Sequence, residues 1–295
     1  MERGKIYLDY NVFTQIESDI HNLEKIKNIF TECDFYYSVI HVEEYLWAEH
    51  NSTEKNYVTL SNMKAVIVGV SKKGVILKPS VNSQNGIIIE MPQSFDACYN
   101  LEMHYNTQNP VSEDAEWNFS HRKILRRDLQ ERNINAKNFS NLDYNEIWEE
   151  VEIKNRIEQL NNERMKNLHD IKAQRNNYSR SDDKGERIYS DEEIDLLLDL
   201  TKDICSVERN CFQNNIPSYP SLENAIEVLN NVLCECGYMH DKSERTERSG
   251  IYDVGHMIYA TYCDKFVTKD ARFARRAKAI YYYLGIKTQV EVFPK

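Results

Sequence analysis

Short apolar runs alternate with segments of helical periodicity at the N-terminal end of the chain. Residues 5–8 form a short apolar run, which is typical of a buried strand in a parallel sheet. Residues 12–30 have apolar side chains at helical spacing, residues 35–38 predict a second strand, and residues 41–49 predict another helix. This order predicts a β-α-β-α unit with parallel strands and right-handed crossovers.

The C-terminal end resumes the same alternation. The helices expected there span residues 221–236, 252–262 and 271–284, and the strands span residues 265–267 and 289–293. Because both ends follow one pattern, we expect residues 1–58 and 221–295 to form one discontinuous α/β domain.

Residues 59–220 have a different character and are expected to form an insertion. Short strands are predicted at residues 65–70, 75–78 and 87–90, and helices at residues 112–132 and 145–174. The second of these helices has apolar residues at roughly heptad spacing, and a further helix is predicted to start at the capping box of Ser190. The insertion is therefore predicted to contain a few short strands and a long helical hairpin.

The composition indicates a soluble globular protein, with 41% apolar residues and a net charge of -10 over 295 residues. This acidic balance argues against broad non-specific coating of nucleic acid, which usually requires a basic field. It does not exclude a nuclease, because a bound cation inverts the local charge. A local basic patch, such as the run at Arg122, Lys123, Arg126 and Arg127, can also hold phosphates, although it can equally be a solvated helix face.

The seven cysteines are odd in number and have no framework spacing. The N-terminus has no signal-peptide pattern, and no window of the chain reaches 18 apolar residues. We therefore expect a cytoplasmic protein that does not associate with a membrane.

The candidate functional residues are four acidic residues next to the expected strands and helices: Asp9, Glu44, Asp253 and Asp270. Carboxylates just past strands, or at the start of helices, can hold hard divalent cations in a cleft. Their oxygen ligands suit Mg²⁺ or Mn²⁺. A zinc site at Cys234, Cys236 and His240 is the weaker alternative, because the spacing is not standard and no fourth ligand is evident.

Several of these acids have a simpler interpretation. Asp9 and Asp253 could be N-caps of the helices that follow them. Glu43 competes with Glu44, although the spacing from the preceding strand favours Glu44. His256 lies one turn after Asp253, so it could approach the site or be an ordinary core or surface histidine.

The four acidic motifs, in this order, resemble those of the PIN-domain nucleases. The family has Asp-x-Asn after its first strand, Glu on the helix that follows a serine, Asp at the head of a helix with an Ala-Thr-like pair, and Thr-x-Asp-x-x-Phe after a late strand. The matching residues are Asp9 and Asn11, Ser38 and Glu44, Asp253 with Ala260 and Thr261, and Thr268, Asp270 and Phe273. The resemblance covers about residues 1–50 and 221–295, and typical members have a much shorter connection between these ends.

The resemblance implies a PIN-like α/β domain in three layers, with a central, mainly parallel sheet flanked by helices and interrupted by the insertion. It implies that one or two Mg²⁺ or Mn²⁺ ions bind the four catalytic carboxylates, with Asn11 and Thr268 in support. The implied reaction is endonucleolytic hydrolysis of RNA that leaves a 3′ hydroxyl and a 5′ phosphate. Candidate nucleic-acid contacts follow on the last helix, at Arg272, Arg275 and Arg276.

Two further functions remain open at this point. A DNA nuclease would share the same site chemistry, and a catalytically silent PIN-like scaffold would keep only the fold. As a nuclease, the protein would suit the role of a toxin or an antiphage defence effector. The helical insertion would then bind a protein partner, an inhibitor or a second copy of the chain.

Overall fold

The protein has an α/β fold in which helices flank a mainly parallel sheet. The computed structural model describes residues 3–50, 57–71, 75–77, 88–90, 95–100, 139–178, 207–214, 219–239 and 244–293. The strands are β1 (Gly4–Leu8), β2 (Cys33–Ser38), β3 (Val75–Leu77), β4 (Ile88–Glu90), β5 (Lys265–Thr268) and β6 (Gln289–Val292). They form one sheet in the order β4-β3-β2-β1-β5-β6.

Every pairing in this sheet is parallel except the pairing of β4 with β3 at one edge. From β1 the chain continues to β2 on one side, whereas β5 pairs with β1 on the other side. The order of the strands thus changes direction at β1. In open α/β sheets the carboxyl ends of the strands at such a point commonly border a binding crevice.

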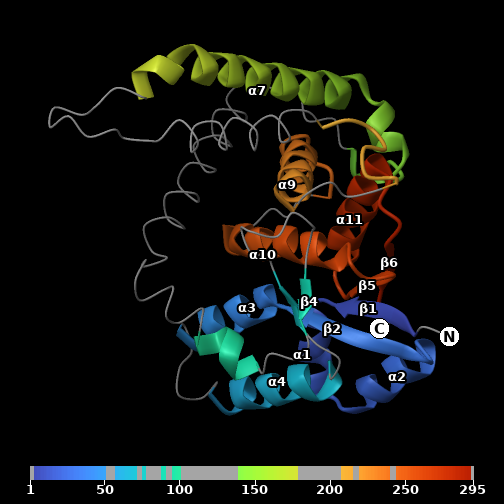
Figure 1. Cartoon of the computed structure of the whole chain (residues 1–295). Helices are drawn as coiled ribbons and strands as arrows, with labels where there is room; N and C mark the ends of the chain where they lie inside the picture. Colours follow the sequence, from blue (N-terminus) through green and yellow to red (C-terminus); the bar gives the residue numbers. More distant parts are fainter. Residues whose placement is uncertain are drawn as a thin grey trace, which may run out of the picture.

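Helices cover both faces of the sheet (Figure 1). On one side lie α1 (Tyr10–Ser18), α2 (His21–Ile29) and α4 (Tyr57–Val70), and on the other lie α9 (Tyr219–Glu235), α10 (Glu244–Ala260) and α11 (Ala271–Leu284). The remaining elements are α3 (Val39–His50), α7 (Val151–Tyr178) and the short 3₁₀ helices η2 (Phe139–Asn141) and η3 (Glu146–Glu149). Helix α7 lies outside α9, away from the sheet (Figure 1).

The two faces of the sheet have separate apolar cores. In β1, Ile6 and Leu8 belong to the core with α1 and α4, whereas Tyr7 belongs to the core with α9, α10 and α11. This division follows from the alternation of side chains along a strand. Ile6, Tyr7 and Leu8 of β1 are fully buried because both faces of the sheet are covered, which explains the continuous apolar run in the sequence.

The predicted α/β class and the parallel pairing of the terminal segments are confirmed. The structure corrects the helix predicted at residues 12–30, which is two helices, α1 and α2. The break is at Asp19, whose backbone is extended and whose Oδ1 accepts a hydrogen bond from the backbone nitrogen of His21 at 3.0 Å. Aspartate favours such local bonds over helix continuation.

The strand predicted at residues 65–70 is wrong, because these residues belong to helix α4. A short apolar run does not distinguish a strand from a buried helix segment. The helix is favoured by packing: Met63 and Ile67, one turn apart, are buried in the core that α4 shares with α1.

The helix predicted at residues 252–262 also differs, since α10 begins at Glu244. Asp253 therefore lies inside the helix and not at its head, which excludes the interpretation of this residue as an N-cap. The first half of α10 has few apolar residues, so it has no periodic pattern that would predict a helix.

Part of the middle region is described. The predicted strands at residues 75–78 and 87–90 correspond to β3 and β4, and they extend the same sheet. The helix predicted at residues 145–174 corresponds to η3 and α7. The basic run at residues 122–127 and the helix expected from Ser190 lie outside the described residues. Within the described ranges, no helix is both long and apolar enough to cross a membrane.

Candidate active site

The neighbouring parallel strands β1 and β5 have their carboxyl ends side by side. Asp9 directly follows β1, and Asp270 lies two residues after β5. Leu8 of β1 pairs with Val267 of β5, and the backbone nitrogen of Asp9 donates to the carbonyl of Val267 at 2.9 Å. Asp9 precedes α1, and Asp270 precedes α11. Both carboxylates therefore lie at the point where the strand order changes direction.

Helices α3 and α10 bring Glu44 and His256 to the same edge. The Nε2 atom of His256 lies 2.9 Å from Oε2 of Glu44 and 3.6 Å from Oδ1 of Asp9. Close approach of the two helices requires Gly255, because a Cβ atom there would lie only 2.6 Å from Cδ1 of Ile40. The structure thus brings Asp9 and Glu44 together, with a buried imidazole in contact with Glu44 and close to Asp9.

Asn11 and Thr268 connect the loops that carry the two aspartates. Thr268 Oγ1 donates to Asp9 Oδ2 at 2.5 Å, and Asn11 Nδ2 donates to Thr268 Oγ1 at 3.2 Å. Asn11 Oδ1 in turn accepts from the backbone nitrogen of Lys269 at 2.9 Å. These bonds limit the rotation of the Asp9 carboxylate and hold the ends of β1 and β5 together.

Asp253 comes from α10, one turn before His256, and pairs with Arg276 of α11. Arg276 Nη2 lies 2.7 Å from Asp253 Oδ2, and its Nη1 donates to the carbonyl of Met239 at 2.8 Å. Arg276 is only 4% exposed, so this ion pair is largely removed from water. The guanidinium compensates the charge of this third carboxylate.

Asp270 has a structural role as the N-cap of α11. Its Oδ1 accepts from the backbone nitrogens of Arg272 and Phe273 at 2.8 and 3.0 Å. Capping satisfies two of the free N–H groups of the helix and directs the positive end of its dipole at the carboxylate. The cap fixes the position of Asp270 relative to Thr268, whose hydroxyl accepts from the Asp270 nitrogen at 3.1 Å.

Burial raises the pKa values of three of the carboxyl groups, and repulsion between carboxylates adds to this effect for two of them. Burial raises the pKa of Asp9 to about 6, since the stabilising effect of His256 is smaller and Glu44 adds repulsion. Burial alone raises the pKa of Glu44 to about 8. Burial also raises the pKa of Asp253 well above its usual range, despite Arg276, and the charges of Asp9, Glu44 and Asp270 add to this effect. A cation near these groups would relieve both the burial and the repulsion.

The donor chemistry of the cluster fits a hard divalent cation. Asp9, Glu44 and Asp253 offer carboxylate oxygens whose charged forms are destabilised here, which a bound Mg²⁺ or Mn²⁺ ion would reverse. The described residues contain no group of three or more His, Cys, Asp or Glu side chains already arranged to hold a metal ion. The side chains instead engage His256, Arg276 and the N-terminus of α11.

Of the two glutamates considered, Glu44 is the one that lies with Asp9 and His256. Burial raises the pKa values of Tyr219 and Tyr259, and the charge of Glu43 adds to this effect, so Glu43 lies near these two rings. The contact of His256 with the acids was left open by the sequence. The signal that favours it is the spacing of one helical turn from Asp253.

The candidate phosphate contacts on α11 have different surroundings. Arg272 is exposed at the start of the helix, close to Asp270. Arg275 Nη2 donates to the carbonyl of Leu142 at 2.7 Å. Arg276 is buried against Asp253, so its observed contacts lie within the chain.

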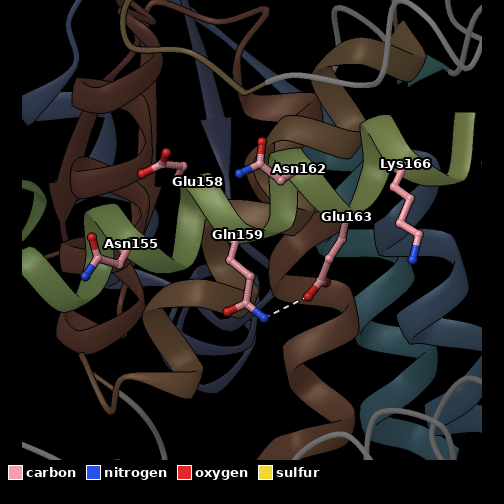
Figure 2. A pocket seen from close by; sticks show the side chains of 6 residues that line it. All are labelled: Asn155, Glu158, Gln159, Asn162, Glu163 and Lys166. Carbon is pink, nitrogen blue, oxygen red and sulfur yellow. Dashed lines mark hydrogen bonds between the residues drawn. The ribbon is translucent and has the colours of Figure 1, made fainter. Parts of the chain in front are cut away.

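Two hollows in the described structure lie apart from the four acids. One is lined by side chains of α7, where Gln159 Nε2 donates to Glu163 Oε1 at 2.7 Å (Figure 2). Its lining residues are Asn155, Glu158, Gln159, Asn162, Glu163 and Lys166. The other lies at the opposite ends of the strands, where its lining includes Asp264 and the first residue of β5, Lys265.

The functional assignment depends on the geometry of the acidic cluster. Comparisons of the chain with protein-family models, with curated proteins and with solved structures found no match. In this geometry, four carboxylates from separate segments of the chain lie at the carboxyl ends of the parallel strands.

Proposed function

We propose that the protein is a metal-dependent nuclease whose active site is formed by Asp9, Glu44, Asp253 and Asp270. The observation that carries the proposal is the convergence of these carboxylates, from the ends of β1 and β5 and from helices α3 and α10, at the carboxyl edge of the sheet. Clusters of buried carboxylates with raised pKa values are typical of functional sites. They are otherwise unfavourable for stability, because burial opposes their ionisation.

The four carboxylates would hold one or two Mg²⁺ or Mn²⁺ ions. A cation held there would supply a bound water of lowered pKa and would stabilise the leaving oxygen of an in-line displacement. Thr268 and Asn11 orient Asp9 through their hydrogen bonds, and Arg276 holds Asp253 toward the cluster. The cap on α11 keeps Asp270 at the same edge. The chain therefore supplies positioning, which is the main protein contribution to this type of hydrolysis.

RNA is the proposed substrate, because the motifs resemble those of the PIN-domain nucleases. The products would be a 3′ hydroxyl and a 5′ phosphate. In this proposal the protein acts as a toxin or an antiphage defence effector, and its helical region binds a partner or an inhibitor. Cleavage assays on several nucleic acids separate this function from that of a DNA nuclease or a silent scaffold.

The test is to incubate purified protein with labelled single-stranded RNA, tRNA and DNA, in the presence of Mn²⁺, Mg²⁺ or EDTA. The Asp9→Asn variant is compared with Asp264→Asn as a matched control. Asp264 lies at the opposite end of β5, where its Oδ2 accepts from the Lys5 backbone nitrogen at 2.8 Å. We expect metal-dependent RNA cleavage that Asp9→Asn abolishes and Asp264→Asn retains. Cleavage in EDTA, or full activity of Asp9→Asn, would contradict the proposal.

A further inference from the structure

A chain of buried polar side chains lies directly behind Glu44. Its members are Tyr7 of β1, Ser38 at the end of β2, His41 of α3 and His256 of α10. All of these side chains are at most 1% exposed. Since buried polar atoms are almost always paired, the donors and acceptors in this chain can be assigned by accounting for every hydrogen.

The tautomer of His41 can be assigned first, because both of its ring nitrogens have a backbone partner. Its Nδ1 accepts from the backbone N–H of Ser38 at 3.0 Å, so its proton is on Nε2, which donates to the carbonyl of Leu8 at 2.7 Å. The lone pair of His41 Nδ1 is therefore already used. The Tyr7 hydroxyl, at a longer distance of 3.4 Å from this atom, needs another acceptor.

That acceptor is His256 Nδ1, which lies 2.8 Å from Tyr7 Oη. Ser38 Oγ, at 2.6 Å, then donates to Tyr7 Oη. The reverse direction would leave the Ser38 hydroxyl, among the described residues, with only His41 Nδ1 at 3.5 Å, whose lone pair is occupied. If every polar group is to have a hydrogen-bond partner, Ser38 donates to Tyr7 and Tyr7 donates to His256 Nδ1. The proton of His256 is therefore on Nε2.

The protonated Nε2 atom of His256 faces the acidic site, 2.9 Å from Glu44 Oε2. We propose that His256 is a positioning residue of the nuclease site: it donates to Glu44 and so fixes this carboxylate beside Asp9 for cation binding. This inference rests on the proposed metal-dependent function. Hydrogen bonds from outside a ligand set orient its carboxylates in this way.

A neutral imidazole suits this role better than a cationic side chain. It uses one lone pair of Glu44 and adds no full charge, so the other carboxylate oxygen keeps its attraction for a cation. Asp253 shows the contrast, because the Arg276 guanidinium compensates its charge. The fixed order of donors from Ser38 onward also holds the imidazole in one tautomer.

Two substitutions of His256 distinguish the roles of its two ring nitrogens. The amide of His256→Asn can take the place of Nδ1 and keep the contact with Tyr7, but it is too short to reach Glu44. The amide of His256→Gln can take the place of Nε2 and restore the donor to Glu44. The experiment measures the dissociation constant of Mn²⁺ by titration calorimetry or electron paramagnetic resonance, without any nucleic acid present.

We expect His256→Asn to weaken Mn²⁺ binding by about 10- to 100-fold, as for other partners of metal ligands. His256→Gln should recover most of that loss, and Asp264→Asn should bind as the wild type does. Unchanged affinity in His256→Asn, or an equal loss in both His256 variants, would overturn the proposal. An equal loss would mean that packing, and not the donor to Glu44, is what matters.

A second variant covers the case in which His256→Asn does not fold, as judged by circular dichroism. Tyr7→Phe removes only the hydroxyl that fixes the His256 tautomer, and it should weaken Mn²⁺ binding several-fold. Wild-type affinity in Tyr7→Phe would then overturn the inference. Wild-type protein that binds Mn²⁺ but cuts no nucleic acid refutes only the nuclease proposal, whereas wild-type protein that binds no Mn²⁺ refutes both.

Discussion

The two halves of the acidic cluster differ in how their charges are compensated. Asp9 and Glu44 contact neutral groups, namely the Thr268 hydroxyl and the His256 imidazole. On the other side, Asp253 pairs with Arg276, and Asp270 caps helix α11. A cation would favour the ionised forms of the first half, whose pKa values are raised by burial, whereas Arg276 and the cap on α11 hold the second half in place. We therefore expect ion binding to depend most strongly on Asp9 and Glu44.

The largest expected effect comes from removing a charge in the uncompensated half. Asp9→Asn should lower the cleavage rate on the order of 10³-fold or more, because electrostatic stabilisation in such sites is worth this much. The thermal stability in EDTA at pH 8 should be equal to or above that of the wild type, since an unfavourable buried charge is removed. A large loss of stability would show that Asp9 is a structural residue, contrary to this account.

Substitutions at the ion pair of Asp253 and Arg276 should lower the free energy of unfolding. Arg276→Met leaves the Asp253 carboxylate buried without its partner, which typically destabilises a fold by about 3–5 kcal/mol. The double variant Arg276→Met with Asp253→Leu should recover much of the loss but remain inactive. Urea unfolding curves measure both effects. A loss below about 1 kcal/mol in Arg276→Met would contradict the compensation that we describe.

The raised pKa values in the cluster should make the stability of the fold depend on pH. The folded pKa values of Glu44, about 8, and Asp9, about 6, lie above the ordinary values of these groups. Between its ordinary and its folded pKa, each carboxyl binds more protons in the folded than in the unfolded chain, so stability falls as pH rises. In EDTA we expect the Tm to fall by several degrees from pH 5 to pH 8.

Two comparisons with the wild-type protein test whether the buried carboxyl groups cause the fall in Tm. Glu44→Gln should flatten the fall in Tm at the upper end of the range, because Glu44 has the higher pKa. Addition of Mn²⁺ should also reduce the fall, since the ion stabilises the ionised carboxylates. The same slope in Glu44→Gln and in the wild type would show that other groups cause the effect.

The smallest expected effect concerns the cap at Asp270. Asp270→Ala removes the two hydrogen bonds to the start of α11 and should destabilise the fold by about 1 kcal/mol. Asp270→Asn keeps a good capping side chain, so its stability should remain near that of the wild type. Both variants should lose cleavage if the carboxylate charge serves the cation. Activity in Asp270→Asn would restrict Asp270 to the structural role.

Much of the fold could be predicted because the terminal segments have strong periodicity. The helix predicted at residues 271–284 has the bounds of α11, and the expected strands match β1, β2, β5 and β6 within two residues. The prediction failed where the period is ambiguous, as in α4, whose short β-branched run is helical because of its packing. It also failed at the start of α10, which is polar and shows no apolar face.

Asp9 and Asp270 could be selected from the sequence because they follow the ends of predicted strands, which is a local signal. The partners of these acids could not, since Tyr7 and His256 are 249 residues apart in the chain and meet only in the folded state. The burial of Arg276 follows from its position in the sequence. It lies three residues after Phe273 and four before Ile280, which places it on the buried face of α11.

The proposed cation site is tested most directly by locating Mn²⁺ by anomalous diffraction from crystals grown with the ion. We expect a peak within about 2.0–2.6 Å of carboxylate oxygens of Asp9 and Glu44. The Asp253 and Asp270 side should lie next to that peak. A peak elsewhere, or none at this edge of the sheet at saturating Mn²⁺, would contradict the assignment of the cluster as a cation site.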